Sequence, residues 1–165
     1  MKVIPIHYTA SVPVTNWLAI ESDAKEMAEL LDREYENTSV ALHHCQVSEK
    51  PFNFFVVNPK YIKEAVMELG SRYIVNPHIV ATEENSLVPL KEGCLSFPLL
   101  KPRNVMRYLL CIVEFGIPDP SQPNGLAHKK VEVNRLIAQM FQHECQHAEG
   151  KNIRWASPKK KTYEQ

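Results

Sequence analysis

Two histidines four residues apart, with a glutamate directly after the first, constrain this chain more than any other feature. They lie in the segment His143-Glu144-Cys145-Gln146-His147, within a region from about Val133 to Glu149 whose apolar period predicts a helix. Residues four apart share one face of a helix, so both imidazoles can bind one metal ion. Glu144 then lies near the open side of that ion, where it can take a proton from bound water instead of ligating. Gly150 predicts the end of this helix.

A third metal ligand is expected from a different part of the chain. Leu136 and Met140 continue the histidine face toward the start of the helix, so this face should point into the protein. A hydrolytic metal site uses three protein ligands and keeps a fourth position open for water. Cys94 is the candidate for the third ligand, because a thiolate binds iron, zinc or nickel well. The competing interpretation is a pair of buried structural histidines, with Cys94 a small buried hydrophobe.

The composition indicates an ordinary globular protein. The chain has 165 residues, with 19 Lys and Arg against 19 Asp and Glu, so no overall charge favours nucleic acid or an anionic membrane. No segment approaches the ~20 apolar residues of a membrane span, and the N-terminus lacks the apolar run of a secretory signal. We therefore expect one domain over residues 1–165, located in the cytoplasm, with a short basic tail from about residue 157. Neither a nucleic-acid partner nor a membrane partner is expected.

The remaining pattern predicts strands before the long helix. Residues 1–20 are expected to form an extended arm, and Ser22 is expected to cap a helix that runs to about Tyr35. Residues 61–69 fit either a helix or a strand. Strands are predicted at 54–57, at 72–75 with its end at Asn76-Pro77, and at 109–115, before a loop over 116–125. A series of strands followed by one long helix at the end of the chain favours an α+β fold.

Together these segments resemble the peptide deformylases, a family with three sequence motifs. Glu92-Gly93-Cys94-Leu95-Ser96 matches the family's E-G-C-L-S, and the segment from Gln142 to His147 matches its Q-H-E-x-x-H. Asn76-Pro77-His78-Ile79 is similar to the family's N-P-x-I, and Arg107 with the following apolar residues resembles a family strand. The resemblance implies an α+β fold in which antiparallel sheets wrap around a central metal-binding helix carrying HExxH.

The resemblance also implies an activity and a cofactor. Members of the family hydrolyse the N-formyl group of formyl-methionine at the N-terminus of nascent polypeptides and release formate. By this resemblance Cys94, His143 and His147 hold one divalent metal ion per chain. Fe²⁺ is the expected native metal, and Zn²⁺, Ni²⁺ or Co²⁺ are able to occupy the site. The expected partners are formyl-methionyl peptide N-termini, with transient proximity to the ribosome, in the cytoplasm of a bacterial or phage-infected cell or in an organelle.

The implied mechanism assigns roles to three further residues. A metal-bound hydroxide attacks the formyl carbonyl, and Glu144 acts as general base and then as general acid. The side chain of Gln46 and the backbone N–H of Leu95 donate hydrogen bonds to the oxyanion. Substrate contacts are expected from Val40, Ala41, Leu42, His43, Glu92, Gly93 and Arg107.

The family's first motif, G-φ-G-φ-A-A-x-Q, is altered in this chain. The segment from Ser39 to Gln46 occupies its position and keeps both apolar φ residues and the final glutamine, but has lost both glycines and both alanines. Side chains alternate between the faces of a strand, so we expect one of His43 and His44 to be exposed and the other to be bonded. The alternatives are that the histidines enter the pocket, or form a second metal site with Cys45. We expect an active enzyme with an altered peptide preference.

Two other functions share part of this pattern. A zincin-type metalloprotease also uses HExxH, but takes its third ligand downstream, where this chain offers only Glu149 and Glu164. A metal-structured domain that binds formylated or unmodified N-termini without catalysis is favoured only by the altered first motif. Replacing Cys94 separates the first of these alternatives from a deformylase.

Overall fold

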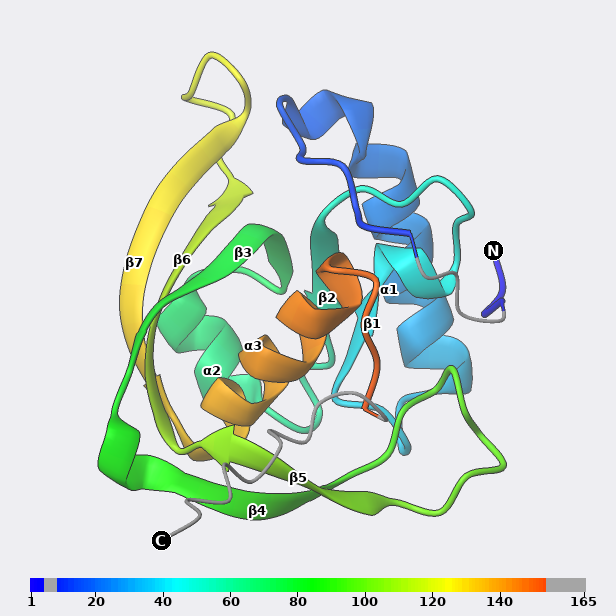
Figure 1. The fold of residues 1–165 in the computed structure, drawn as a ribbon. Helices are drawn as coiled ribbons and strands as arrows, with labels where there is room; N and C mark the ends of the chain where they lie inside the picture. The colour runs from blue at the N-terminus through cyan, green and yellow to red at the C-terminus, as the bar shows by residue number, and fades with distance from the viewer. Residues whose placement is uncertain (5–8, 154–165) are drawn as a thin grey trace, which may run out of the picture.

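The structure, a computed structural model, describes residues 1–4 and 9–153, and these form helices packed against two antiparallel sheets (Figure 1). The helices are α1 (Glu21–Glu34), α2 (Lys63–Leu69) and α3 (Arg135–Ala148), with short 3₁₀ helices η1 (Trp17–Ala19), η2 (His44–Gln46) and η3 (Glu84–Ser86). The larger sheet has the order β1 (Ala41–His43), β2 (Phe54–Val57), β3 (Tyr73–Thr82), β6 (Leu110–Pro118) and β7 (Leu126–Asn134). The smaller sheet pairs β4 (Leu87–Glu92) with β5 (Arg103–Tyr108).

Helix α3 lies between the two sheets. It contacts β1, β3, β6 and β7 of the larger sheet and β5 of the smaller one (Figure 1). Helix α1 packs against β1 and β2, so these strands separate the two helices. The predicted α+β class with antiparallel sheets is confirmed.

Strand β2 is apolar throughout because both of its faces are covered. All four residues from Phe54 to Val57 are fully buried. Phe55 packs edge to face on Phe141 of α3, with ring centroids 5.5 Å apart, whereas Phe54 belongs to the core under α1. A strand buried on both sides is a continuous apolar run rather than an alternating one, which is why the sequence predicted this strand correctly.

Strand β3 continues through Asn76-Pro77, where the sequence predicted its end. The ladder with β6 shifts register between Val75 and His78, and Asn76 adopts a left-handed φ of 48°. Its side chain binds the backbone of Val14, accepting from N at 2.8 Å and donating to O at 2.7 Å. The strand therefore accommodates the proline at a bulge. Asn76 tolerates the left-handed conformation there, and its side chain holds the N-terminal arm in place.

Several predicted boundaries also change. Helix α1 begins at Glu21 after Ile20, so Ser22 lies in the first turn and is not its cap. Residues 61–69 resolve into α2, and β6 extends through Pro118 into the predicted loop. Helix α3 begins at Arg135 instead of Val133, because the preceding residues form β7, a strand that the sequence analysis missed.

The end of α3 follows the sequence prediction. Gly150 lies directly after Glu149, the C-cap residue of the helix, with a left-handed φ of 72°, the conformation that favours glycine there. No helix in the described part of the chain combines the length and apolar character that crossing a membrane requires. The predicted basic tail from about residue 157 lies outside the described residues.

Candidate metal centre

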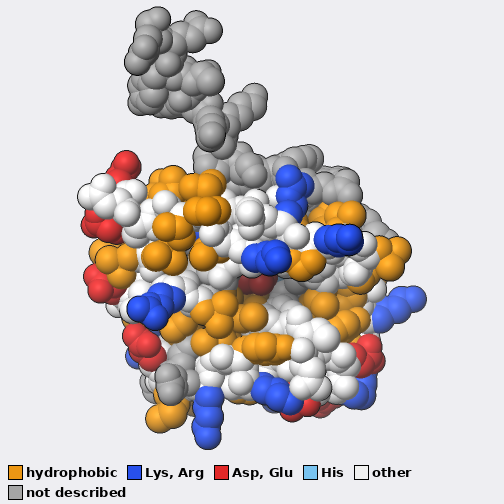
Figure 2. Space-filling model, turned by 90° about the horizontal axis from the view of Figure 1, so that it is seen from below, with side chains coloured by type: hydrophobic (Ala, Val, Ile, Leu, Met, Phe, Trp, Pro, Cys, Tyr) orange, Lys and Arg blue, Asp and Glu red, His pale blue; other side chains and the backbone are white. Residues whose placement is uncertain are grey.

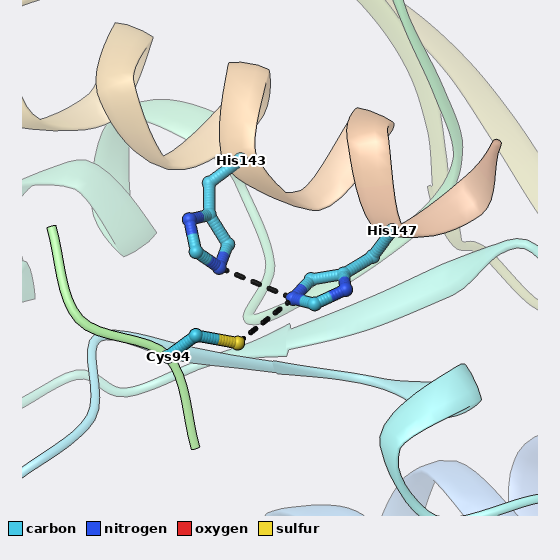
Figure 3. A group of neighbouring side chains, drawn as sticks. All are labelled: Cys94, His143 and His147. Atoms are coloured by element: carbon cyan, nitrogen blue, oxygen red, sulfur yellow. Dashed lines mark hydrogen bonds between the residues drawn. The ribbon is translucent and has the colours of Figure 1, made fainter. Parts of the chain in front are cut away.

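Three side chains direct one sulfur and two nitrogen atoms toward a common point (Figure 3). His143 and His147 extend from one face of α3, and Cys94 lies on the segment after β4. The Nε2 atom of His147 lies 3.1 Å from Nε2 of His143 and 3.4 Å from Sγ of Cys94. All three ligand atoms lie within 4.8 Å of one another, and no other such group of His, Cys, Asp or Glu occurs among the described residues.

This donor set fits a tetrahedral metal ion with one position open. Zinc or a similar ion lies about 2.0–2.3 Å from nitrogen and sulfur ligands, which places neighbouring tetrahedral donors about 3.3–3.8 Å apart. The observed separations of 3.1 and 3.4 Å are close to that spacing. One thiolate and two imidazoles leave the fourth position free for water, as hydrolytic sites require.

A buried carboxylate contacts His143 at the ring nitrogen that faces away from the other donors. Glu92 lies at the end of β4, and its Oε2 is 3.0 Å from Nδ1 of His143. Arg107 donates to the same carboxylate from Nε at 2.6 Å and from Nη2 at 2.8 Å. A carboxylate opposite Nδ1 favours the proton on that nitrogen, so the lone pair of Nε2 points toward Cys94 and His147.

The hydrogen-bond partners of Glu92 keep its carboxyl group ionised. Burial alone would raise the pKa of this carboxyl, but the hydrogen bonds from Arg107 and His143 outweigh burial and lower it to about 2. A depressed folded-state pKa stabilises the fold above the unfolded value of about 4.5, and this stabilisation is lost as the pH falls toward 2. Glu92 is therefore a fixed negative charge at neutral pH.

The sequence prediction for Arg107 needs correction. Its side chain is 2% exposed and does not line the cavity beside the metal donors. Because both hydrogen bonds that it makes to Glu92 are buried, the guanidinium is occupied and shielded from a peptide. Arg107 thus stabilises the carboxylate that orients His143, and the expected peptide contact is not supported.

Replacing Arg107 with leucine is expected to destabilise the fold by about 3–5 kcal/mol, because the Glu92 carboxylate would remain buried without its main partner. Urea unfolding monitored by circular dichroism measures this change. Arg103→Leu on the same strand is the matched control, since Arg103 is exposed and should change stability by less than about 0.5 kcal/mol. Equal stabilities of the two variants would contradict the structural role of the buried pair.

A cavity of about 670 Å³ opens beside the three donors. Figure 2 shows it as a hollow with acidic atoms at its floor and apolar and basic side chains around it. Its walls come from the end of α1, the start of β1, the segment after β4, and one face of α3. The α3 wall consists of Leu136, Gln139, Met140, His143 and Glu144. The stripe that was predicted to point into the protein is buried at Met140, but Leu136 at its start is 41% exposed at the cavity, so the prediction was wrong there.

The predicted substrate-binding residues divide into two groups. Val40, Ala41, Glu92 and Gly93 line the cavity, whereas Leu42, His43 and Arg107 do not. Leu42 is fully buried in the core under α1. His43 is also fully buried, because the chain leaves β1 at this residue and turns into η2. The expectation that Leu42 and His43 contact the peptide is therefore not supported.

The two neighbouring histidines are both buried, so the prediction that one is exposed was wrong. His43 caps η2, accepting at Nδ1 from the backbone N–H of Cys45 at 3.1 Å. His44 accepts at Nδ1 from Phe52 N at 2.9 Å, and its Nε2 is 3.3 Å from Asp23. The alternation argument fails because a 3₁₀ helix replaces the continuous strand that it assumes.

Glu144 lines the cavity as a buried carboxyl group. It is 4% exposed, and its Oε2 has no hydrogen-bond partner among the described residues. Burial raises the pKa of Glu144 to about 7; His143 opposes this shift, and the charge of Glu92 adds to it. A carboxyl group with a pKa near neutrality can both accept and return a proton.

Gln46 and Leu95 lie at the same wall. The Oε1 atom of Gln46 accepts from His43 N at 2.8 Å, which directs its Nε2 toward Ser96 Oγ at 3.1 Å and Cys94 Sγ at 3.7 Å. Leu95 also lines the cavity, and no acceptor within the described residues binds its backbone N–H. Two donors are therefore placed next to the candidate ligand Cys94.

Two glutamines of α3 position the site although the sequence analysis gave them no role. Gln142 accepts from Tyr108 N at 2.9 Å and donates to Tyr108 O at 2.8 Å, which fixes α3 to β5. Gln139 donates to Glu92 Oε1 at 3.2 Å. The signal for Gln139 was its spacing, since a residue four positions before His143 shares its helix face. The signal for Gln142 was its place as the first residue of the Q-H-E-x-x-H pattern.

Comparisons with known proteins show the family and the fold of this chain. The family model described as Polypeptide deformylase matches residues 5–162. A peptide deformylase structure from Plasmodium falciparum is 23% identical, with a TM-score of 0.75 over 96% of this chain and 87% of the other. For the Thermus thermophilus enzyme the identity is 26% and the TM-score 0.73, over 96% and 87% of the two chains. A probable peptide deformylase from a synechococcus phage is 24% identical, with a TM-score of 0.72 over 94% and 99%. No curated protein sequence matches.

Proposed function

Because this chain belongs to the polypeptide deformylase family, we propose that it is a single catalytic domain that hydrolyses the formyl group of formyl-methionine at the N-terminus of new polypeptides. The observation that carries this proposal is the convergence of Cys94, His143 and His147 on one point, beside a cavity that Cys94, His143 and the buried Glu144 line. Hydrolysis of a formyl-amide needs a nucleophilic water, a proton acceptor and donors for the oxyanion, and the wall offers a group for each need.

Cys94, His143 and His147 would hold one divalent ion. Such an ion would lower the pKa of a bound water toward about 7 and so supply a nucleophile at neutral pH. We propose Fe²⁺ as the native metal, with Zn²⁺, Ni²⁺ or Co²⁺ able to replace it, because thiolate and imidazole donors suit all four. Glu92 would orient His143 through the Nδ1 contact and keep its Nε2 available as a ligand.

Glu144 would move the proton during the reaction. Its buried carboxylate accepts a proton from the attacking water and delivers it to the amine nitrogen as the C–N bond breaks. Burial raises the pKa of this carboxyl above its ordinary value, which makes the carboxylate a stronger base. The methionine side chain would occupy the apolar part of the cavity beside Met140 and Leu136.

Gln46 and Leu95 would stabilise the negative charge that develops on the formyl oxygen. The side-chain amide of Gln46 is held by its bond to His43 N, so little reorganisation is needed when the charge forms. The backbone N–H of Leu95 supplies the second donor.

Replacing Gln46 with glutamate is expected to lower kcat/KM by about 100-fold, because the donor is lost while the acceptor for His43 N remains. Steady-state kinetics on a formyl-Met peptide measure the effect. Gln122→Glu, a change of the same kind at an exposed residue, should leave the rate unaltered. A Gln46→Glu enzyme as fast as the parent would show that this amide is not an oxyanion donor.

The direct test is formate release from formyl-Met-Ala-Ser by protein loaded with Fe²⁺ or Ni²⁺ in the absence of oxygen. Turnover that requires the metal supports the proposal. A full metal complement without turnover on any formyl-methionyl peptide would contradict it and favour a domain that only binds N-termini.

A further inference from the structure

We propose that the rim of the cavity continues the substrate site and selects formyl peptides with acidic side chains soon after the formylated residue. The inference rests on the proposed deformylase function and adds a substrate class to it. Three basic residues at the rim, Lys91, Lys101 and Arg103, carry the argument.

The basic residues surround one side of the cavity mouth. Lys91, near the end of β4, lines the cavity itself, and Lys101 and Arg103 flank Pro102, which also lines it. All three side chains are exposed. In Figure 2 basic side chains lie close to the hollow, while the other acidic side chains of this face lie toward its edge.

These three basic residues give their side of the rim a positive charge, because no acidic side chain among the described residues pairs with them. None of the three basic residues takes part in an ion pair within the described residues. The opposite rim includes Glu34, whose carboxylate accepts from Arg33 Nη2 at 2.9 Å and is therefore partly neutralised. At the floor, Glu92 is neutralised by Arg107. An anionic group at the mouth would thus meet attraction rather than repulsion.

The rest of the substrate must pass this rim. The formyl end lies at the metal donors on the cavity floor, so the following residues leave through the mouth. An extended chain advances about 3.3 Å per residue, so residues two to four of the peptide lie within about 10 Å of the formylated residue. The rim also carries Leu99, which is 96% exposed, beside Leu100, which lines the cavity. The peptide itself is the occupant that these exposed apolar and basic groups fit.

The test compares three peptides that differ only in charge: formyl-Met-Leu-Glu-Glu, formyl-Met-Leu-Ser-Ser and formyl-Met-Leu-Lys-Lys, all amidated at the C-terminus. The metal-loaded enzyme is expected to show kcat/KM about threefold to tenfold higher for the acidic than for the basic peptide at low ionic strength. The ratio should approach one in about 0.5 M salt, because the screening length falls from about 10 Å at 0.1 M to a few ångströms near 1 M.

Charge reversal identifies the residues responsible. The double variant Lys91→Glu, Lys101→Glu is expected to invert the preference, so that the basic peptide becomes the better substrate. Lys129→Glu is the matched control, because Lys129 is an exposed lysine on β7, outside the cavity lining, and its variant should keep the parental ratio.

The outcomes separate this inference from the proposed function. No turnover of any of the three peptides would overturn the deformylase proposal. Equal kcat/KM for the acidic and basic peptides with normal turnover would overturn only the charge selection. An unchanged preference in the double variant would likewise exclude Lys91 and Lys101 as its cause.

Discussion

The Glu144→Ala variant is expected to release formate about 10²- to 10⁴-fold more slowly than the parent while binding the same amount of metal. Glu144 faces the cavity with a buried Oε2 that has no partner among the described residues, and its carboxyl group is not among the three converging donors. Its removal therefore takes away the proton acceptor and leaves the ligands in place. Formate release by protein with a measured metal content gives the rate for each occupied site.

Glu149→Ala provides the control for that experiment. Glu149 follows the same helix and is exposed, with its carboxylate paired to Lys151. This variant should retain the parental rate and metal content. A Glu144→Ala enzyme with more than about a tenth of the parental rate would contradict the role proposed for this carboxylate. Loss of metal in that variant would point instead to a ligand role.

The Cys94→Ala variant is expected to lose stoichiometric metal after dialysis against a chelator and, with it, nearly all activity. Two imidazoles on one helix remain, but a hydrolytic site needs three protein ligands to hold the ion firmly. Elemental analysis of the dialysed protein measures the loss directly. The same experiment separates a deformylase from a zincin, because a zincin would keep its metal without this upstream cysteine.

Cys145→Ala is the matched control for the ligand role. Cys145 lies on α3 between the two histidines, but its Sγ is 3.6 Å from Pro77 O, away from the common point of the donors. This variant should keep its metal and its activity. If both cysteine variants retained one ion per chain, Cys94 would not be a ligand.

The local sequence pattern was sufficient to predict those features that depend on a single helix or a single strand. The spacing of His143 and His147 required only a helix to bring both imidazoles to one face, and α3 provides it. Gly150 ends that helix as expected, and the apolar run of β2 is a buried strand. The approach of Cys94 to the histidines could not come from spacing. Cys94 was a candidate ligand because of its thiolate chemistry, and the family resemblance then assigned it to the same metal ion as the histidines.

Tertiary packing decided the role of Arg107. It is 15 residues from Glu92 in sequence, on the strand that pairs with β4. The register places Arg107 opposite Val88 and Glu92 opposite Arg103, so the buried side chains of Arg107 and Glu92 meet by reaching along the sheet. Nothing in the local sequence distinguishes a guanidinium that faces a peptide from one buried against a carboxylate. Similarly, β7 escaped prediction because many of its side chains are exposed, so its apolar period is weak and its existence depends on pairing with β6.

The sequence by itself determined which chemical groups this protein has and which of them share a helix face, because helical periodicity is local. Only the tertiary structure decided where the altered first motif places its histidines. His43 and His44 leave the strand at η2, where their ring nitrogens bond to Cys45, Phe52 and Asp23. Burial and hydrogen bonding between distant segments fixed those positions, and such contacts depend on the packing of the whole chain rather than on any one segment.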